Sequence, residues 1–478
     1  MSEPSNQQER KQWIKYKKLA IKAIGPIYDL WVDRSVELLL FRRRMVSQGP
    51  IDILKSHHYG RQISQRDFNI THTWPIIEAL AEMELRPSRI DIGTLTIQWL
   101  DADQKNTTLK AFLKDKLAAY LGSAKPSFKP RDVVLYGFGR IGRIMTRILV
   151  SEEGGGDALR IRGVVCRGDI DLEKRANLLR RDSVHGSFRG NITFDEAKHI
   201  LTANGSQIQF ISANSPDKID YESYDIRNAL IIDNTGVWRD RRDLEQHLKS
   251  KGVDRVLLTA PGKGDVPNLV YGVNAKAYSP EERIFSAASC TTNAIVPPLK
   301  VLNDIFGIDY VHVETVHSYT NDQNLLDNFH KKKRRGRSAP LNMVLTETGA
   351  ASAISKALPE LTGRVTGNAV RVPTPNVSLA ILNLQLKKAV GREEINEALR
   401  LSSLTGPLVA QIDYTRDEEV VSTDMVGNPH PAIVDSLATM SHGKQATVYV
   451  WYDNEYGYAM QVARLARIIC GVERLRYY

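Results

Sequence analysis

A strand that runs straight into a glycine-rich turn constrains this chain more than any other feature. The apolar run Val133 to Tyr136 continues without a break into Gly137, Phe138, Gly139, Arg140, Ile141 and Gly142, and a helical pattern follows to Val150. Glycines at these spacings allow a tight turn, close approach of backbone to a pyrophosphate, and close packing of helix on strand. The segment therefore predicts a dinucleotide site at a helix N-terminus, the alternative being a turn shaped for packing alone.

The residues after this turn predict an α/β fold with a Rossmann-type parallel sheet. Short apolar runs alternate there with helical patterns, as expected for parallel strands joined by crossover helices; the runs are Val133 to Tyr136, Ile161 to Cys166, Ala229 to Asp233 and Arg255 to Thr259. Between about residues 310 and 450 the strands become longer, which predicts a second, α+β domain; its runs are Tyr310 to Val316, Val377 to Leu386 and Ala446 to Trp451. The helical pattern Gly457 to Ile469 is expected to pack back onto the first sheet.

The front of the chain predicts a separate, mainly helical module. Leu109, Phe112, Leu113 and Leu117 fall at helical spacing after Asn106, Thr107 and Thr108, any of which could cap a helix. Pro75 is expected in the first turn of another helix. We expect a helical extension at 1–121, a linker at 122–130, a coenzyme domain at 131–289 that is completed by 454–478, and a catalytic domain at 290–453.

Charge and cysteine content limit the classes of protein. Residues 1–130 carry 21 Lys and Arg against 14 Asp and Glu, so most of the net charge of +10 lies at the front. A solvated helical face explains such a bias more simply than binding to nucleic acid. Three cysteines cannot form a disulfide framework, and the longest apolar run at the front, Leu38 to Phe41, is too short for a signal peptide or a membrane helix. These features favour a cytoplasmic protein with no membrane partner.

Cys290 is the candidate nucleophile. It lies in Ser289-Cys-Thr-Thr-Asn293, directly before a helical pattern that runs from Ile295 to Phe306. The dipole at a helix N-terminus stabilises a thiolate, and a thiolate that attacks an aldehyde forms a thiohemiacetal that can be oxidised to a thioester. A cysteine taken alone is more often a small buried apolar residue, but the polar run around this one argues against that alternative.

His317 is the candidate general base. It ends the predicted strand Val311 to Val316, and side chains at the ends of elements are those that loops bring together into sites. With eleven histidines in the chain, one such placement means little by itself. His185 and His330 are the next candidates.

Several segments, in order, resemble the phosphorylating glyceraldehyde-3-phosphate dehydrogenase family over roughly residues 131–478. The matching segments are Gly137 to Gly142 (GFGRIG), Asp182 to Gly186 (DSVHG), Ser289 to Asn293 (SCTTN), Val316 to Thr320 (VHSYT), Thr348 to Ala351 (TGAA), Arg371 to Ser378 (RVPTPNVS) and Trp451 to Tyr458 (WYDNEYGY). The family does not commonly carry the helical extension. The resemblance implies a homotetramer that oxidises D-glyceraldehyde 3-phosphate with NAD or NADP and inorganic phosphate.

The resemblance also implies roles for single residues. Cys290 would form the hemithioacetal, and His317 would take the proton. Thr320 and Arg371 resemble the site for the substrate's own phosphate, and Ser289, Thr291, Thr348 and Gly349 resemble the site for inorganic phosphate. Asn454 is similar to the residue that holds the nicotinamide carboxamide, and Tyr458 is similar to an aromatic beside that ring. The implied coenzyme contacts are completed by Thr235 and Gly236.

The choice of coenzyme stays open. An acid is expected about 20 to 30 residues after the turn, at the end of the second strand, where it binds the adenosine ribose. Arg167 and Gly168 occupy that place, unless a shift of one residue brings in Asp169. Asn328-Phe329 also replaces a Leu-Pro pair common in strictly NAD-dependent members, and the loop 330–337 (HKKKRRGR) is unusually basic. Use of NADP is therefore a reasonable hypothesis.

Two other functions remain possible from the sequence. Erythrose-4-phosphate dehydrogenase shares the thiol, the base and the fold. A regulatory or binding protein on a dehydrogenase fold would instead use the basic front module, but binding alone needs neither a thiol nor a base.

Overall fold

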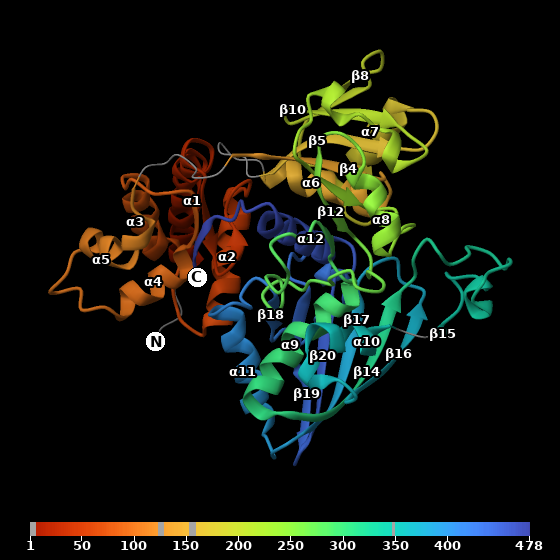
Figure 1. The fold of residues 1–478 in the computed structure, drawn as a ribbon. Coiled ribbons are helices and arrows are strands. Elements are labelled where there is room, and N and C mark those ends of the chain that lie inside the picture. The colour runs from red at the N-terminus through yellow and green to blue at the C-terminus, as the bar shows by residue number, and fades with distance from the viewer. Residues whose placement is uncertain (1–5, 123–128, 153–158, 347–348) are drawn as a thin grey trace.

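The computed structural model describes residues 6–122, 129–152, 159–346 and 349–478. Three lobes lie side by side in Figure 1: a front module in red and orange, a coenzyme lobe in yellow and green, and a larger lobe in green to blue. The C-terminus returns to the front module. The predicted linker at 122–130 falls mostly outside the described residues.

The front module combines helices with a small sheet. Its helices are α1 (Asn6–Arg34), α2 (Pro50–Ser64), α3 (Ile70–Ala81), α4 (Ile92–Asp101) and α5 (Leu109–Lys116). The sheet has the order β2 (Arg43–Arg44), β1 (Val36–Leu40), β3 (Ser88–Asp91), β21 (Leu475–Tyr477). β1 is fully buried because α1 and α4 pack on it. The sequence predicts a mainly helical module but not this sheet, whose last strand comes from the opposite end of the chain.

Two helix starts in this module test the capping predictions. Thr108, one of the three expected caps, accepts a hydrogen bond from Ala111 N at the start of α5. The placement of Pro75 in a first turn is wrong, because α3 begins five residues earlier. There the Asn69 side chain accepts from Thr71 N, and the His72 ring accepts from Asn69 N. This capping box fixes the earlier start, and the helix tolerates Pro75 in its second turn.

The coenzyme lobe is an eight-stranded, mainly parallel sheet among the described residues, as expected for a Rossmann-type domain. Its order is β13 (Ile284–Ser286), β12 (Val253–Leu258), β11 (Ala229–Asp233), β4 (Arg131–Tyr136), β5 (Leu159–Cys166), β10 (Ser206–Ser212), β9 (Ile200–Ala203), β8 (Ile192–Asp195). The chain passes from β4 to β5 on one side, whereas β11 pairs with β4 on the other. Ligands of open α/β sheets bind at such a change of direction, beyond the carboxyl ends of the strands.

The larger lobe is a seven-stranded mixed sheet covered by helices. Its order is β15 (Val344–Thr346), β16 (Val365–Val372), β14 (Ile308–Ser318), β17 (Ser378–Leu386), β20 (Gln445–Tyr452), β19 (Ala432–His442), β18 (Ile412–Thr415). The helices on it are α9 (Cys290–Phe306), α10 (Ala350–Ala357) and α11 (Arg392–Leu404). Alternation along β17 is strict, with every second side chain buried, so one sheet face forms the core. The expected α/β class with a second α+β domain is confirmed.

The last helix joins the lobes. α12 (Tyr456–Ile469) packs against α6 (Arg140–Glu152) of the coenzyme lobe, and its inner residues share that lobe's core. Beyond it, β21 leaves this lobe and pairs with β3 of the front module. The end of the chain therefore serves two lobes, whereas the sequence assigned 454–478 to the coenzyme domain alone. Within the described residues, no helix is both long enough and apolar enough to cross a membrane.

Candidate active site

The nucleophile candidate opens the central helix of the larger lobe. Ser289 is the N-cap of α9, its Oγ accepting from Thr292 N at 3.0 Å, and Cys290 is the first helical residue. A serine cap explains why the helix begins here, since its side chain satisfies one of the free N–H groups of the first turn. The thiol thus lies beside the positive end of the helix dipole.

His317 reaches the thiol because β14 ends next to the start of α9. Its Nε2 lies 3.6 Å from Cys290 Sγ. Parallel pairing of β14 with β16 places His317 directly opposite Arg371. The structure therefore brings together the three side chains that the sequence singled out for attack, base and anion binding.

Burial shifts the pKa of each reactive group toward its neutral form. Burial, and then the nearby Arg371, lowers the pKa of His317 to about 3. Burial raises the pKa of the Cys290 thiol, although Arg371 acts in the opposite direction. Loss of hydration at the thiol thus acts against the stabilisation of a thiolate that the helix dipole and Arg371 provide. A protonated thiol beside an unprotonated imidazole needs proton transfer before it can attack.

The other ring nitrogen of His317 has two competing contacts. Its Nδ1 lies 2.7 Å from Ser318 O and 2.8 Å from Arg371 Nη1. A proton on Nδ1 suits donation to Ser318 O, whereas Arg371 could donate only to an unprotonated Nδ1. The first tautomer leaves Nε2 free to accept the thiol proton, and in it Arg371 still donates to Ser318 O at 2.9 Å.

A second arginine completes a cationic corner. Arg335, from the basic loop, donates to Asp322 Oδ2 at 2.5 Å and lies 3.2 Å from Thr346 Oγ1. The Thr320 hydroxyl donates to the same carboxylate. Arg371 is mostly buried, and its Nε has no hydrogen-bond partner among the described residues. An unsatisfied buried guanidinium nitrogen suits an anionic ligand.

The four residues assigned to inorganic phosphate are only partly placed. The Ser289 hydroxyl caps α9 and also contacts Thr292 Oγ1 at 2.7 Å. Thr291 Oγ1 lies 4.0 Å from Cys290 Sγ and 3.1 Å from Tyr452 OH. Gly349 is exposed at the N-terminus of α10, whereas Thr348 lies outside the described residues.

The glycine-rich turn has the shape that a pyrophosphate site needs. Gly137 has φ +103°, and a Cβ on Gly142 would lie 2.3 Å from Gly137 O. No side chain fits at Gly142 without opening the turn. A Cβ on Gly139 would meet open space, so its backbone is accessible. Phe138 packs edge-to-face on Phe210 at 5.2 Å, and Ile141 is half-buried behind the turn. α6 begins at Arg140 and directs its N-terminus at this space.

The remaining coenzyme candidates lie at neighbouring strand ends. A Cβ on Gly137 would lie 3.1 Å from Thr235 Cγ2, so Thr235 and Gly236 border the turn. The Thr235 hydroxyl and N–H both donate to Asp233 Oδ1. Arg167 and Gly168 follow β5 and are exposed, as is Asp169. Neither the Arg167 nor the Asp169 side chain is buried in another role.

Asn454 and Tyr458 lie where α12 meets the reactive pair. Asn454 Oδ1 accepts from the hydroxyls of Ser318 and Ser378, both at 2.9 Å. Its amide nitrogen has no hydrogen-bond partner among the described residues and is available as a donor. The Tyr458 hydroxyl donates to Ala288 O at 3.0 Å, two residues before the nucleophile.

Sequence reasoning missed an ionic cluster that ties the glycine-rich turn to the segment containing Asn454. Arg140 pairs with Asp182 at 3.1 Å and with Glu455, and His185 Nε2 lies 2.9 Å from the same glutamate. Asp182 Oδ1 also accepts from the backbone N–H groups of Val184 and His185. Arg140 lies in GFGRIG, Asp182 and His185 lie in DSVHG, and Glu455 lies in WYDNEYGY. Opposite charges in three distant motifs were therefore the sequence signal that could have indicated this cluster.

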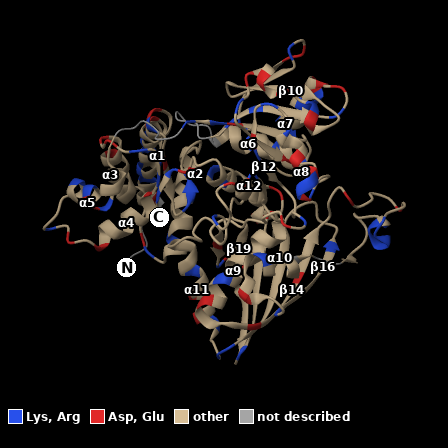
Figure 2. Ribbon diagram, viewed as in Figure 1, with Lys and Arg blue, Asp and Glu red and all other residues tan. Residues whose placement is uncertain are grey.

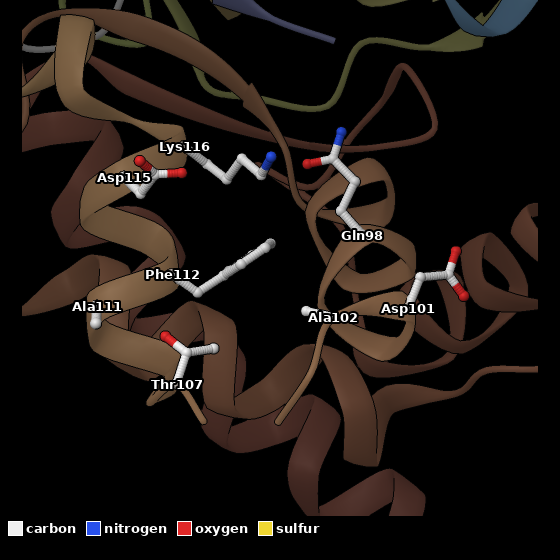
Figure 3. Close-up of a pocket in the computed structure, with 8 residues that line it drawn as sticks. All are labelled: Gln98, Asp101, Ala102, Thr107, Ala111, Phe112, Asp115 and Lys116. Carbon is white, nitrogen blue, oxygen red and sulfur yellow. The ribbon is translucent and has the colours of Figure 1, made fainter. Parts of the chain in front are cut away.

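A wide hollow of about 510 Å³ lies in the front module, away from the reactive pair (Figure 3). It is lined by Gln98, Asp101, Ala102, Thr107, Ala111, Phe112, Asp115 and Lys116. The Phe112 ring is tilted against the Trp99 ring, with 5.3 Å between their centroids, and it lies under the Lys116 ammonium. With no thiol or imidazole in its lining, the hollow is not the catalytic centre. The described residues also hold no cluster of side chains suited to a metal ion.

Comparison with known proteins places both lobes in one family. Residues 131–241 match the model of the NAD binding domain of glyceraldehyde 3-phosphate dehydrogenase, and residues 289–454 match the model of its C-terminal domain. A glyceraldehyde-3-phosphate dehydrogenase-like protein of Pseudomonas aeruginosa (strain UCBPP-PA14) is 51% identical over 457 residues, 95% of this chain and 98% of that protein. Glyceraldehyde-3-phosphate dehydrogenase 2 of Bacillus subtilis is 38% identical over 70% of this chain and 95% of its own length.

A plant relative gives the same picture. The chloroplastic glyceraldehyde-3-phosphate dehydrogenase A of Zea mays is 40% identical over 72% of this chain and 83% of its own length. The match with the P. aeruginosa protein extends into the front module, because it covers nearly the whole chain. The front module is therefore shared with at least one relative.

Proposed function

We propose that this chain, which belongs to the glyceraldehyde-3-phosphate dehydrogenase family, converts D-glyceraldehyde 3-phosphate and inorganic phosphate to 1,3-bisphosphoglycerate by oxidising the aldehyde. The family consists of NAD-dependent oxidoreductases that act on an aldehyde. The observation that carries the proposal is the thiol of Cys290 at 3.6 Å from His317 Nε2, with Arg371 directly opposite His317 on the paired strand.

The reaction uses the two reactive residues in sequence. His317 Nε2 takes the proton of Cys290 as Sγ forms a bond to the aldehyde carbon, and the new oxyanion is protonated to a hemithioacetal. Oxidation of that carbon leaves a thioester on Cys290 and returns the hydroxyl proton to His317. An oxygen of inorganic phosphate then attacks the thioester carbon, the C–S bond breaks, and the leaving thiolate takes the proton back from His317 as the acyl phosphate departs.

The residues present fit a dinucleotide coenzyme. The absence of room for a side chain at Gly142 and the accessible backbone at Gly139 suit a pyrophosphate on the N-terminus of α6. The amide NH₂ of Asn454 suits the carboxamide oxygen of a nicotinamide. A nicotinamide held there would supply the hydride acceptor for oxidation of the hemithioacetal carbon. Within this proposal, Tyr458 limits the space beside the ring, and Thr235 and Gly236 border the pyrophosphate.

Two anion subsites fit the two phosphates. Arg371 and Thr320 would bind the phosphate of the substrate, since Arg371 keeps a free Nε and a guanidinium can bind an anion with two hydrogen bonds. Ser289, Thr291, Gly349 and Thr348 would bind the attacking phosphate. An anion that draws Arg371 away from His317 Nδ1 would favour the tautomer in which Nε2 accepts a proton.

The basic loop supports the use of NADP and an oligomer. In Figure 2 its short helix η4 (Lys333–Gly336) is blue, and in Figure 1 it projects from the body. Large apolar side chains in the segments on both sides of this loop are 72% to 90% exposed, namely Leu325, Leu326, Phe329, Leu341 and Met343. Such a patch is typical of an interface between subunits, so we expect a homotetramer, and the nucleophilic thiol favours a reducing compartment such as the cytoplasm.

Steady-state kinetics with NAD and NADP, with and without inorganic phosphate, test the proposal. We expect phosphate-dependent oxidation of glyceraldehyde 3-phosphate with either coenzyme. A preference for NAD above about tenfold in kcat/KM, worth about 1.4 kcal/mol, would remove the NADP hypothesis. Faster oxidation of erythrose 4-phosphate, independent of phosphate, would favour erythrose-4-phosphate dehydrogenase. No activity at all, with salt-sensitive binding of nucleic acid, would favour a binding protein.

A further inference from the structure

A buried arginine of the front module ends inside the catalytic lobe. Arg42 Nη1 donates to Ser403 O at 2.5 Å and to Ile412 O at 2.8 Å, and Nη2 lies 3.1 Å from Asp413 Oδ1. The residue is only 7% exposed. Buried ion pairs of this kind contribute little net stability because both charges lose their hydration. A contribution to stability therefore does not explain the pair.

The front module holds Arg42 in a strained turn. Phe41 and Arg42 have φ values of +44° and +70°, a region that residues other than glycine rarely adopt. The buried Asp91 stabilises the turn, because its carboxylate accepts from Phe41 N at 2.9 Å and from Arg42 N at 2.7 Å. Strained backbone of this kind costs free energy and persists where its surroundings enforce it, often at functional sites.

Asp413 links Arg42 to the loop at 427–430. Its Oδ1 also accepts from Tyr59 OH of α2 at 2.6 Å, whereas its Oδ2 accepts from Asn428 Nδ2 at 2.9 Å. Burial alone would raise the pKa of Asp413, but Arg42 and His430 outweigh it and hold that pKa below its usual range. Asp413 is therefore a charged acceptor shared by the front module and the loop at 427–430.

That loop in turn fixes the residues around Asn454. Gly427 N donates to Asp453 Oδ2 at 2.8 Å, and Asp453 Oδ1 accepts from Glu455 N and Tyr456 N. A Cβ on Gly457 would lie 3.2 Å from Asn428 O, so the loop packs tightly on the first turn of α12. The segment 453–455 thus has Asp453 bound to the loop, Asn454 hydrogen-bonded to Ser318 beside His317, and Glu455 paired with Arg140.

We propose that Arg42 is a positioning residue that acts through Asp413, Asn428 and Asp453 to hold Asn454 in place for the nicotinamide end of the coenzyme. The front module is then a working part of the coenzyme site, although it contacts no substrate. This inference rests on the role that the proposed function gives to Asn454.

Binding of whole coenzyme and of a fragment separates positioning from general stability. Calorimetric titration would use whichever of NAD and NADP the wild type binds more tightly, and ADP-ribose or its 2′-phosphate as the fragment without nicotinamide. Arg42→Met should raise the Kd of the coenzyme roughly three- to tenfold and leave the Kd of the fragment unchanged. Asn428→Ala breaks the middle of the path without touching the front module, and it should have the same effect if Arg42→Met folds poorly.

Arg400→Met is the matched control. Arg400 Nη1 donates to Ile63 O at 3.0 Å, so it also joins the catalytic lobe to the front module, but it contacts neither Asp413 nor the loop at 427–430. This variant should leave both dissociation constants unchanged even if thermal unfolding shows a loss of stability. Equal weakening of coenzyme and fragment by Arg42→Met, or the same selective weakening by Arg400→Met, overturns the positioning role.

Asn454→Ala distinguishes this inference from the proposed function. It should weaken binding of the coenzyme and not of the fragment, and Arg42→Met should add nothing in that background. If Asn454→Ala weakens coenzyme binding and neither Arg42→Met nor Asn428→Ala does, the positioning role of Arg42 is refuted, whereas the nicotinamide role of Asn454 stands. If Asn454→Ala does not discriminate between the two ligands, the nicotinamide role of Asn454 fails, and the inference fails with it.

Discussion

The front module should lose stability in mild acid through a single buried histidine. His57 of α2 is 2% exposed, and its ring nitrogens lie 2.8 Å from Ile53 O and 2.8 Å from Thr73 Oγ1 of α3. Burial lowers its pKa to about 4 from 6.5. Because the unfolded chain binds a proton here before the folded chain does, stability falls as the pH drops below 6.5 and stops falling below about 4.

The size of this effect follows from the difference in pKa. The difference between 6.5 and about 4 corresponds to about 3 kcal/mol when the transition is complete and to about 2 kcal/mol at pH 5. Hydrogen exchange of α2 and α3, measured at pH 7.5 and pH 5 and corrected for intrinsic rates, reports the free energy of opening. The wild type should lose about 2 kcal/mol more than His57→Gln between these pH values.

The adjacent and exposed His58 provides the control, since His58→Gln should keep the acid sensitivity of the wild type. An equal loss in the wild type and in His57→Gln would show that the buried ring is not the group that titrates.

Three further variants test the catalytic lobes. His317→Asn should lower kcat by about 10²- to 10⁴-fold in rapid-mixing assays, because Cys290 loses its base; a loss below tenfold would point to another proton acceptor. Gly142→Ala should abolish measurable coenzyme binding in calorimetry, because the new Cβ meets Gly137 O at 2.3 Å, whereas Gly139→Ala, whose Cβ meets open space, should keep measurable binding. Arg371→Met should raise the KM for the phosphorylated aldehyde about 10- to 100-fold, as expected when a charge-assisted hydrogen bond is lost, and an unchanged KM would move the substrate phosphate elsewhere.

Local sequence signals predicted the parts of the molecule that local chemistry determines. The glycine-rich turn follows β4 because Gly137 and Gly142 have conformations or contacts that exclude other residues, and such constraints are visible in a single segment. Ser289 caps α9 for an equally local reason. The contact between Cys290 and His317 could not be predicted from a local signal, because it depends on β14 ending beside α9. The family resemblance supplied the evidence for it.

Contacts between distant segments were beyond single-sequence reasoning. β21 pairs with β3 across almost the whole chain, and Arg42 reaches Asp413 from another lobe. Neither has a periodic pattern or a motif that marks its partner. The position of Pro75 was misjudged for a different reason, because the capping box at Asn69 outweighs the usual preference of proline for a first turn.

Mass spectrometry of the enzyme tests directly whether Cys290 carries an acyl group that inorganic phosphate removes. The protein would be mixed with coenzyme and glyceraldehyde 3-phosphate in a phosphate-free buffer, quenched in acid, digested and analysed. We expect a phosphoglyceroyl thioester on the peptide containing Cys290, and we expect it to disappear within a few turnovers after inorganic phosphate is added. An unmodified Cys290 while reduced coenzyme accumulates, or a thioester that phosphate does not discharge, would contradict it.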